Sequence, residues 1–264
     1  MNIIIITGAA GGIGREYVKK MLKEKGIDEI WAVGRTESKL VKLAEEFGSK
    51  VVPVTCDVTK DEDLLAVQDL LKKKNPRVKW LINCAGTRAL YKHDVPLPRM
   101  LAPIRTNAVG NMAMCYMCIP YMGKGDHILN VSSEASLLAI PSNNNYSASK
   151  VALRFFSKGL EYELKPKGIK VTCCCPGWVD TPLIDFPADE YASISKFPGM
   201  VKPEKVARTS LKDARKGKSL TFPTERVHMN YYLCKFLPTW MPIWYGMHVE
   251  ANEYKKFKKS GILS

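Results

Sequence analysis

The sequence predicts an α/β fold in which one parallel β-sheet is covered by helices on both faces. Short apolar runs alternate along the chain with segments whose apolar residues recur at helical spacing. The runs are apolar at consecutive positions, as expected for strands that are buried on both sides. We predict strands at 2–7, 29–34, 50–56, 79–86, 126–133 and 168–177. We predict helices at 12–26, 37–48, 61–74, 99–122 and 146–165.

The first half of the chain marks its elements with clear end signals. The strand 2–7, NIIIIT, is an unbroken apolar run that leads into a glycine-rich turn. The helix at 12–26 ends in glycine, and the helix at 61–74 begins with acidic residues, which the positive end of a helix dipole favours. The strand at 50–56 keeps its apolar pattern despite Pro53. Because each strand is followed by a helix, the order is that of βαβ units.

Polar motifs follow the apolar strands in the second half of the chain. NCAG ends the strand at 79–86, NVSS ends the strand at 126–133, and a Pro-Gly turn ends the strand at 168–177. The carboxyl ends of parallel strands meet at one edge of the sheet, where ligands bind in folds of this kind. We therefore expect the functional site at this edge.

Composition and length fit one large α/β domain as well as two small ones, but no obvious linker or internal repeat divides the chain, so we predict a single domain over residues 1–264. The 264 residues are 46% hydrophobic, which is enough to bury a full core. The N-terminal run MNIIIITG reaches its glycine turn too early for a signal peptide or a membrane span. Eight cysteines at irregular spacing predict reduced, buried thiols rather than a disulfide framework, so we expect a cytoplasmic protein.

Cys115 and Cys118 form a CxxC that has two interpretations. It is a redox or metal site, or it places two small apolar residues on the helix predicted at 99–122. No second cysteine pair or neighbouring histidine completes a metal site, which favours the apolar interpretation. We predict no metal site, because the four histidines also show no metal-ligand spacing.

The formal net charge of +14 fits three classes of partner: nucleic acid, a membrane surface, or anionic substrates and cofactors. The basic residues are spread over many segments instead of one tract. Local clusters at 69–79 and 254–261 are typical of a solvated helix end and a chain terminus. We therefore predict no nucleic-acid binding.

The turn after the first strand, TGAAGGIG, indicates a dinucleotide site. Gly8, Gly12 and Gly14 allow a tight turn and a close approach to a pyrophosphate, and Ile13 lies among them at the helix start. The helix N-terminus directs backbone N–H groups toward that anion. A glycine-rich turn is a weak signal alone, but here it joins a strand to a helix within a βαβ pattern.

The end of the second strand predicts a preference between nicotinamide cofactors. An acidic residue there binds the ribose 2′-hydroxyl of NAD(H), whereas a cation accommodates the 2′-phosphate of NADP(H). Arg35 occupies this place, and its planar guanidinium can pair with a phosphate. The alternative is that Arg35 is a solvated loop residue and Glu37 binds the ribose. We predict that NADP(H) is preferred, with NAD(H) as the alternative, although Gly11 supplies no second basic residue.

In NNNYSASK (143–150), Tyr146 and Lys150 lie four residues apart near a predicted helix start. Residues at this spacing lie on one helix face, about one turn apart. The phenol and the ammonium therefore lie side by side. Many helix surfaces carry such a pair, so the spacing alone leaves two interpretations open, an ordinary surface and a reactive pair.

Seven motifs together resemble the short-chain dehydrogenase/reductase family in their order and spacing. They are TGAAGGIG, CDVT (56–59), NCAG (83–86), TNAVG (106–110), NVSS (130–133), YSASK (146–150) and PGWVDT (176–181). The resemblance extends from about residue 2 to 185, and in general element order to about 225. It implies a single-domain Rossmann fold with a doubly wound parallel sheet. It also implies an NAD(P)-dependent oxidoreductase that acts on CH–OH groups.

The resemblance also implies roles for individual residues. The catalytic set is Asn107, Ser133, Tyr146 and Lys150. The cofactor contacts, beyond the glycine turn and Arg35, are Asp57, Val58, Asn83, Ala85, Gly86, Tyr146, Lys150, Pro176, Gly177, Val179 and Thr181. Ser132 is the less favoured neighbour of Ser133. Cys84 stands where many relatives have a second Asn.

The chemistry of ketone reduction agrees with these roles. A free tyrosine has a pKa near 10, so proton exchange at neutral pH requires a stabilised phenolate. The ammonium of Lys150 would stabilise that charge. Ser133 would donate a hydrogen bond to the substrate oxygen, and Asn107 would hold a water that links Lys150 to solvent. Ser133, Asn107 and the glycine turn therefore favour the catalytic interpretation of YSASK.

The sequence after Thr181 is less explicit. Residues 182–200 predict a lid over the site. Residues 226–264 form an aromatic-rich C-terminal extension. This extension is an apolar substrate wall, a membrane-facing patch or, as we favour, a helix pair packed on the core or on a second subunit. Pro238 and Pro242 exclude a continuous membrane span.

These observations leave three functions open. The first is an NADP(H)-dependent alcohol/ketone oxidoreductase for a hydrophobic substrate. A hydroxysteroid or a bile acid is an example, because relatives act on hydroxysteroids and a basic protein suits an anionic amphipath. The second is a 3-ketoacyl-thioester reductase. The third is a catalytically silent NADP-binding regulatory protein. The resemblance further implies a homo-dimer or homo-tetramer.

Overall fold

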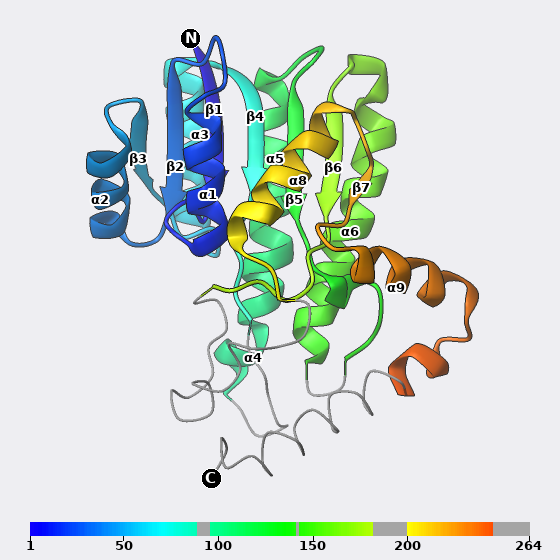
Figure 1. Ribbon diagram of the computed structural model, residues 1–264. Coiled ribbons are helices and arrows are strands. Elements are labelled where there is room, and N and C mark those ends of the chain that lie inside the picture. The colour runs from blue at the N-terminus through cyan, green and yellow to red at the C-terminus, as the bar shows by residue number, and fades with distance from the viewer. Residues whose placement is uncertain (89–95, 141–142, 182–199, 245–264) are drawn as a thin grey trace.

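A computed structural model describes residues 1–88, 96–140, 143–181 and 200–244. Its sheet contains seven parallel strands in the order β3-β2-β1-β4-β5-β6-β7 (Figure 1). The strands are β1 (Asn2–Thr7), β2 (Glu29–Gly34), β3 (Val51–Thr55), β4 (Arg77–Asn83), β5 (His127–Val131), β6 (Lys170–Cys174) and β7 (Leu220–Thr221). Each predicted strand is present. The predicted parallel sheet is therefore confirmed, with β7 as a short unpredicted strand at its edge.

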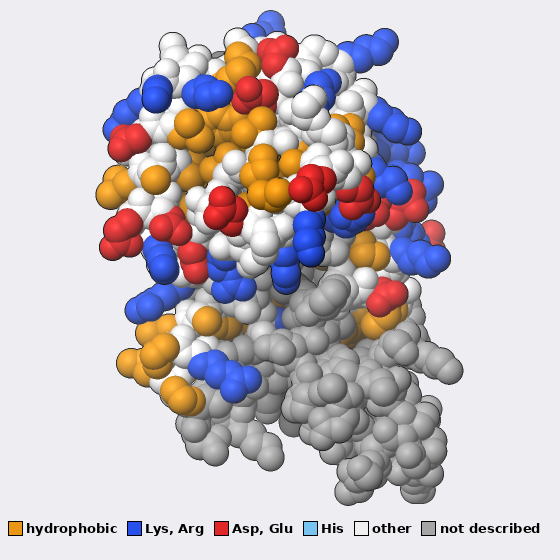
Figure 2. All heavy atoms as spheres, turned by 90° about the vertical axis from the view of Figure 1, so that its left-hand side faces the viewer, with side chains coloured by type: hydrophobic (Ala, Val, Ile, Leu, Met, Phe, Trp, Pro, Cys, Tyr) orange, Lys and Arg blue, Asp and Glu red, His pale blue; other side chains and the backbone are white. Residues whose placement is uncertain are grey.

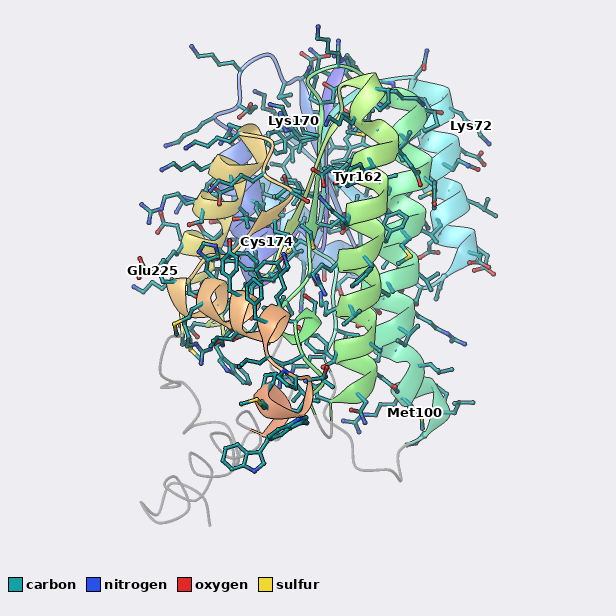
Figure 3. All side chains as sticks on the ribbon, turned by 90° about the vertical axis from the view of Figure 1, so that its right-hand side faces the viewer. Lys72, Met100, Tyr162, Lys170, Cys174 and Glu225 are labelled. Carbon is teal, nitrogen blue, oxygen red and sulfur yellow. The ribbon has the colours of Figure 1, made fainter. Side chains whose placement is uncertain are left out.

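Helices cover both faces of the sheet, as the sequence predicts. One layer contains α1 (Gly12–Met21), α2 (Glu37–Phe47) and α8 (Pro203–Arg215). The other contains α3 (Asp61–Lys74), α5 (Asn111–Cys118) and α6 (Asn144–Leu164), which stand side by side in Figure 3. This arrangement confirms the doubly wound, Rossmann-like fold.

The first strand shows why both faces are buried. Ile4 and Ile6 pack into the core below α1, whereas Ile3 and Ile5 pack into the core on the opposite face. The four side chains alternate because successive residues of a strand point to opposite faces, and all four are fully buried. Each contributes roughly 1.5–3 kcal/mol of burial free energy. An apolar residue at every position is therefore what a central, doubly covered strand requires.

The strand order places a switch point between β1 and β4. The chain moves outward from β1 to β2 and β3, and then returns to add β4 on the other side of β1. In doubly wound sheets ligands bind at the carboxyl ends of the strands near such a reversal. The glycine turn after β1 and the NCAG motif after β4 both lie there.

The long helix predicted at 99–122 is helical but not uniform. It consists of α4 (Leu97–Pro103), a π-helical segment η1 (Ile104–Gly110), α5 and a 3₁₀ turn η2 (Ile119–Tyr121). Pro103 lacks the N–H that a regular helix needs, and π-helical turns relieve such interruptions, often at functional sites. The prediction of one regular helix was therefore wrong in form.

Other element ends also differ from the prediction. The helix predicted at 12–26 ends at Met21, and turns continue to Gly26, whose φ of +69° favours glycine. The predicted elements of the sheet end at 177, so α8 was not anticipated, whereas α9 (Glu225–Phe236) overlaps the extension in which we favoured a helix pair.

The C-terminal extension packs on the rest of the molecule at its beginning. Val227 is the one buried residue of α9, while Tyr232 and Phe236 are 49% and 76% exposed. Figure 3 shows α9, which begins at Glu225, on the opposite side of the sheet from α6. Packing on the core is therefore limited to the start of α9, and the other form of the favoured prediction, packing on a second subunit, stays a prediction. Among the described residues, no helix combines the length and the apolar character that a membrane crossing requires.

Charged side chains are dispersed over the surface. On the face at the β3 edge, basic and acidic side chains alternate with apolar ones instead of forming one basic tract (Figure 2). The eight cysteines are free thiols. Cys115 and Cys118 are fully buried, and burial raises the pKa of Cys115 to about 12, which agrees with the apolar interpretation of this CxxC. The described residues contain no cluster of His, Cys, Asp and Glu side chains that could hold a metal ion.

His127 gives a pH dependence that can be measured. Its ring stacks on Trp80 with centroids 4.0 Å apart, and burial lowers its pKa to about 4. The unfolded chain, with an ordinary histidine pKa near 6.5, takes up a proton between pH 6.5 and 4, and the folded chain does not. This difference should lower the free energy of unfolding by about 2 kcal/mol between pH 7.5 and 5.

The variant His127→Phe keeps an aromatic ring against Trp80 and removes the titrating group. Urea unfolding at pH 7.5 and pH 5 should show about 2 kcal/mol less pH-dependent loss in the variant than in the wild-type protein. Equal losses in the two proteins would show that His127 is not the responsible group.

Candidate active site

The glycine-rich turn joins β1 to α1 at the carboxyl edge of the sheet. Gly8 has a φ of +64°, and a Cβ on Gly8 would lie 2.9 Å from backbone atoms of Ala85. A Cβ on Gly14 would overlap the carbonyl oxygen of Gly8. In the described structure no side chain caps the N-terminus of α1. The first turn of this helix, which begins with Gly12 and Ile13, contains no acidic residue. The unpaired N–H groups of this turn therefore suit a pyrophosphate.

The end of β2 places both candidate ribose partners at the surface. Arg35, Thr36 and Glu37 are all exposed, and β2 lies beside β1. Thr36 is the N-cap residue of α2, and Glu37 opens the first helical turn. A cation and an acid thus lie next to each other, and either can reach a ribose bound at this edge.

The CDVT motif lies at the end of β3 in a rigid turn. The Oδ1 atom of Asp57 accepts hydrogen bonds from the Thr59 amide at 3.0 Å and the Thr59 hydroxyl at 2.8 Å. Val58 is buried, and a Cβ on Gly110 would lie 2.6 Å from its carbonyl oxygen. Gly110 is therefore needed for η1 to approach this turn closely.

Thr7 joins the glycine turn to the NCAG motif. Its Oγ1 accepts hydrogen bonds from the amides of Cys84 at 3.1 Å and Ala85 at 3.0 Å. Burial raises the pKa of Cys84 to about 12 although the Lys150 charge opposes this effect, so Cys84 is a neutral thiol at physiological pH. The position therefore fills space beside the predicted catalytic lysine without adding charge.

A buried amide network that the sequence did not predict supports these loops. Asn83 donates hydrogen bonds to Asn130 Oδ1 at 2.9 Å and to the Asn111 carbonyl at 3.2 Å. Asn130 donates to Ser157 on α6, and Asn111 donates to the Asn107 carbonyl. Asn83 thus stabilises the sheet and its neighbours. Asn130 lies within the NVSS motif, but its link to α6 is a tertiary contact without a local sequence signal.

The two serines after β5 have different surroundings. Ser132 is buried, and its hydroxyl donates to the Lys150 carbonyl at 2.8 Å. Ser133 is half-buried and caps the 3₁₀ turn η3 (Glu134–Ser136), where its Oγ accepts a hydrogen bond from the Ala135 amide at 3.1 Å. That bond does not use the Ser133 hydroxyl proton. Ser133 therefore keeps a proton to donate to a substrate oxygen, whereas Ser132 anchors α6 to β5.

Tyr146 and Lys150 are a buried pair on the first turns of α6. Tyr146 is 8% exposed and Lys150 is 4% exposed, which excludes the interpretation of an ordinary helix surface. The Lys150 Nζ atom donates to the Val131 carbonyl at 3.0 Å and lies 5.7 Å from the centroid of the Tyr146 ring. A buried cation is costly unless it is hydrogen-bonded, so this bond fixes the ammonium at the end of β5, beside Ser133.

Asn107 connects the loop after β4 to α6. Its Oδ1 accepts a hydrogen bond from the Thr87 amide at 2.8 Å, and its Nδ2 donates to the Thr87 carbonyl and to Ser149 Oγ, both at 2.9 Å. A Cβ on Gly86 would lie 3.3 Å from Asn107 Oδ1 and 3.6 Å from Lys150 Nζ. Asn107 Oδ1 and Lys150 Nζ therefore both lie close to Gly86.

The PGWVDT motif returns the chain to the glycine turn. Pro176 is buried, and its carbonyl accepts a hydrogen bond from the amide of Glu134 at 2.7 Å. A Cβ on Gly177 would lie 3.0 Å from Glu134 Oε2, and a Cβ on Gly12 would lie 2.6 Å from Thr181. The motif thus contacts both the Ser133 loop and the start of α1.

Val179 forms a parallel bridge with Val201, so the two chain segments that flank the predicted lid lie side by side. The lid itself lies outside the described residues, except for Met200.

Two further side chains lie at the predicted catalytic tyrosine. The Arg88 guanidinium carbon lies 4.7 Å from the centroid of the Trp178 ring and 5.8 Å from that of the Tyr146 ring. Trp178 belongs to the PGWVDT motif, and Arg88 follows NCAG by two residues. No sequence pattern predicted their contact, because the two segments are distant along the chain.

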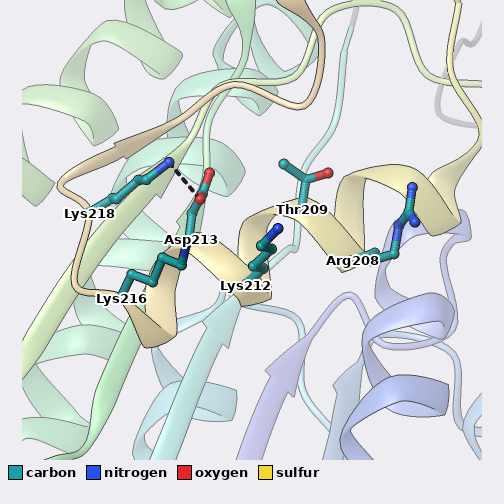
Figure 4. Close-up of a pocket in the computed structure, with 6 residues that line it drawn as sticks. All are labelled: Arg208, Thr209, Lys212, Asp213, Lys216 and Lys218. Atoms are coloured by element: carbon teal, nitrogen blue, oxygen red, sulfur yellow. Dashed lines mark ion pairs between the residues drawn. The ribbon is translucent and has the colours of Figure 1, made fainter.

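A surface hollow along α8 shares no lining residue with this site. Figure 4 shows its lining side chains, Arg208, Thr209, Lys212, Asp213, Lys216 and Lys218, with an ion pair between Lys218 and Asp213. We assign it no role in the reaction.

Comparison with known proteins identifies the family. The family model described as short chain dehydrogenase matches residues 2–190. The chain belongs to the short-chain dehydrogenase family. A relative described as an uncharacterized short-chain type dehydrogenase/reductase of Sinorhizobium fredii is 34% identical over 186 residues. That alignment covers 69% of this chain but 33% of the relative, so the chain spans about a third of that protein's length.

Two other short-chain dehydrogenases are informative. The 3-oxoacyl-[acyl-carrier-protein] reductase of Thermotoga maritima is 30% identical over 222 residues, covering 80% of this chain and 89% of that one. The solved short-chain dehydrogenase from Sphingobium yanoikuyae, in complex with NADPH, has a TM-score of 0.74 and 22% identity. The structural alignment covers 89% of this chain and 92% of that chain, and it shows that the two proteins share a fold.

Proposed function

We propose that this protein is an NADP(H)-dependent oxidoreductase that interconverts a secondary alcohol and a ketone on a hydrophobic substrate. The observation that supports the proposal is the buried Tyr146–Lys150 pair, in which Lys150 Nζ donates to the carbonyl of Val131, two residues before Ser133, at the end of β5. Each of these groups has a use in ketone reduction, and few other reactions need all of them together.

In the proposed reaction, the bound nicotinamide supplies or accepts the hydride. Tyr146 donates a proton to the substrate oxygen during reduction and accepts one during oxidation. The Lys150 ammonium stabilises the tyrosine when it carries negative charge, and the Ser133 hydroxyl donates a hydrogen bond to the same substrate oxygen. Asn107 and Lys150 hold the water through which the proton is restored. Tyr146 and Lys150 are buried, so the negative charge that develops on Tyr146 lies in a low-dielectric environment. Its interaction with the Lys150 ammonium is therefore strong.

The preference for NADP(H) is proposed on the basis of Arg35. Replacing Arg35 by Ala should lower kcat/KM for NADP⁺ by roughly 10–100-fold, the value of a charge-assisted hydrogen bond, and leave NAD⁺ almost unchanged. Initial rates with each cofactor measure this ratio. The matched variant Glu37→Gln should affect NADP⁺ little. If Glu37→Gln impairs NAD⁺ and Arg35→Ala changes neither cofactor, Glu37 is the ribose partner and the preference is for NAD(H).

A second candidate function is the reduction of a 3-ketoacyl thioester. It is supported by the 30% identity to the Thermotoga maritima 3-oxoacyl-[acyl-carrier-protein] reductase. The same proposed catalytic set would serve this substrate, so the two functions differ at the substrate end. Turnover of ketoacyl thioesters without turnover of oxosteroids or oxo-bile acids would select this candidate.

The partners and the location of the enzyme are further parts of the proposal. Exposed apolar side chains on α9 and after it, including Phe236 and Trp240, support contact with a second subunit, an apolar substrate or a membrane surface. A homo-dimer or homo-tetramer and a cytoplasmic location are likewise proposals by analogy with the family. Light scattering of the full chain, with and without lipid vesicles, separates a self-associating surface from a membrane-binding one.

The function is tested by absorbance at the reduced-nicotinamide band. NADP⁺ or NAD⁺ is offered with a panel of secondary alcohols that includes hydroxysteroids, bile acids and 3-hydroxyacyl thioesters. We expect turnover with NADP⁺ and at least one hydrophobic alcohol. Tight NADPH binding without turnover on any member of the panel would instead support a regulatory protein.

A further inference from the structure

We propose that Arg88 binds a carboxylate of the substrate close to the carbon that is oxidised or reduced. The inference rests on the proposed function and names its substrate class, hydrophobic oxo acids and hydroxy acids rather than neutral ketones and alcohols. Arg88 would be a specificity-determining residue, while the chemistry stays with Ser133, Tyr146 and Lys150.

The backbone that carries Arg88 is held in place. The preceding residue, Thr87, is bonded through both its amide and its carbonyl to the side chain of Asn107, at 2.8 and 2.9 Å. Asn107 is fully buried and is itself anchored to Ser149 on α6. The start of the loop is therefore fixed relative to the helix that carries Tyr146, which a binding residue needs.

The guanidinium of Arg88 lies close to two aromatic side chains of the site. It is 4.7 Å from the Trp178 ring centroid and 5.8 Å from the Tyr146 ring centroid. Stacking uses the face of a guanidinium, whereas its hydrogen bonds are donated in its plane, so one group can contact rings and an anion together. A substrate whose oxygen is bound by Tyr146 therefore has Arg88 within reach of a group a few bonds away.

The charges of the described site favour an anion at this place. Arg88 and Lys150 lie at almost equal distances from the Tyr146 ring, 5.8 and 5.7 Å. The acidic residue next to Ser133, Glu134, is already bonded to Arg226 at 3.2 Å and to Asn230 at 2.7 Å. A carboxylate on a substrate bound at Tyr146 would lie near these two cations, and the partial burial of Arg88 strengthens such a pair.

The position favours the substrate over the cofactor as the source of the anion. The cofactor phosphates are expected at the glycine turn after β1 and at Arg35 after β2. Arg88 follows β4 instead, and its ring contacts are the predicted catalytic tyrosine and Trp178. If Arg88 served the cofactor, its loss would weaken NADPH binding, which can be measured separately.

The test compares matched acids and esters. The probes are a short-chain 3-oxo acid and its methyl ester, and an oxo-bile acid and its methyl ester, reduced with NADPH. For at least one pair, wild-type protein should favour the acid by tenfold or more in kcat/KM. Arg88→Gln should lose roughly 10–100-fold for that acid, mainly through KM, and less than about threefold for its ester. Arg88→Lys should recover part of the acid preference, and Arg208→Gln, which removes an exposed arginine on α8, should change neither rate.

Binding measurements keep the inference testable when turnover is slow. Calorimetric titration of each acid and ester into the NADPH complex of Tyr146→Phe gives the same ratio without reaction. Equal affinity for acid and ester, or equal losses for both in Arg88→Gln, would overturn the inference, and weakened NADPH binding in Arg88→Gln would assign the residue to the cofactor. Absence of turnover by wild-type protein, with acid-selective binding intact, would count against the proposed function and not against the role of Arg88.

Discussion

Replacing Tyr146 by Phe is expected to lower kcat by roughly 10³-fold, within the range for loss of a general acid or base. The substitution removes one oxygen and keeps the ring that fills this buried position, so the fold should be unchanged. NADPH affinity should change little, because the ring and Lys150 both remain. Steady-state rates and fluorescence titration with NADPH measure the two quantities.

The same helix provides a matched control. Tyr162 also pairs with a lysine four residues away on α6, with Lys158 Nζ 4.7 Å from its ring centroid, but Tyr162 is 65% exposed (Figure 3). Tyr162→Phe removes the same oxygen and should leave kcat unchanged. Tyr146→Phe with wild-type turnover would exclude Tyr146 as the proton donor, and equal losses in both variants would indicate a general effect on α6.

Replacing Gly14 by Ala is expected to have the second largest effect. The added Cβ would overlap the carbonyl oxygen of Gly8 and approach the Gly8 carbonyl carbon to 2.8 Å. Backbone atoms cannot move aside as a flexible side chain can, so α1 must shift away from β1. We expect a loss of about 3 kcal/mol in the free energy of unfolding, at the upper end for overpacking, and at least a tenfold weaker binding of NADPH. Urea unfolding and NADPH titration measure both.

Gly159, in the middle of α6, is the control for this substitution. No atom lies within 4 Å of the place its Cβ would take. Gly159→Ala should therefore stabilise the protein by roughly 0.5–1 kcal/mol, as expected in a helix interior, and leave NADPH binding unchanged. If Gly14→Ala is as benign as Gly159→Ala, the glycine turn is not packed as closely as described.

The regular part of the fold is predictable because its signals are local. β1 contains four consecutive isoleucines, and Gly8 and Gly14 mark the turn that follows it. The uniform helix at 99–122 was wrong because Pro103 interrupts it and a π-helical segment, η1, follows. Within η1, Gly110 lies close to Val58. These residues are distant along the chain, so helical periodicity cannot report their contact.

The candidate site also contains residues that the sequence predicts and residues that it does not. Ser133, Tyr146 and Lys150 stand in recognisable motifs, and a hydrogen bond from Lys150 to the Val131 carbonyl links the pair on α6 to the end of β5, two residues before Ser133. The supporting network of Asn111, Asn130 and Ser157 was not predicted, because each residue is an ordinary polar side chain until folding buries it. Arg88 was missed for a related reason, since its place beside Trp178 depends on two loops that follow different strands. The lid predicted at 182–200 lies outside the described residues, except for Met200.

The most direct test of the central claim is transfer of deuterium from NADPH labelled at the nicotinamide C4 position. The labelled cofactor is incubated with wild-type protein and the oxo substrates named above, and the products are analysed by mass spectrometry. We predict one deuterium on the new carbinol carbon for at least one substrate, and none with Tyr146→Phe over the same time. NADPH bound with high affinity but no label in any product would contradict the proposed oxidoreductase.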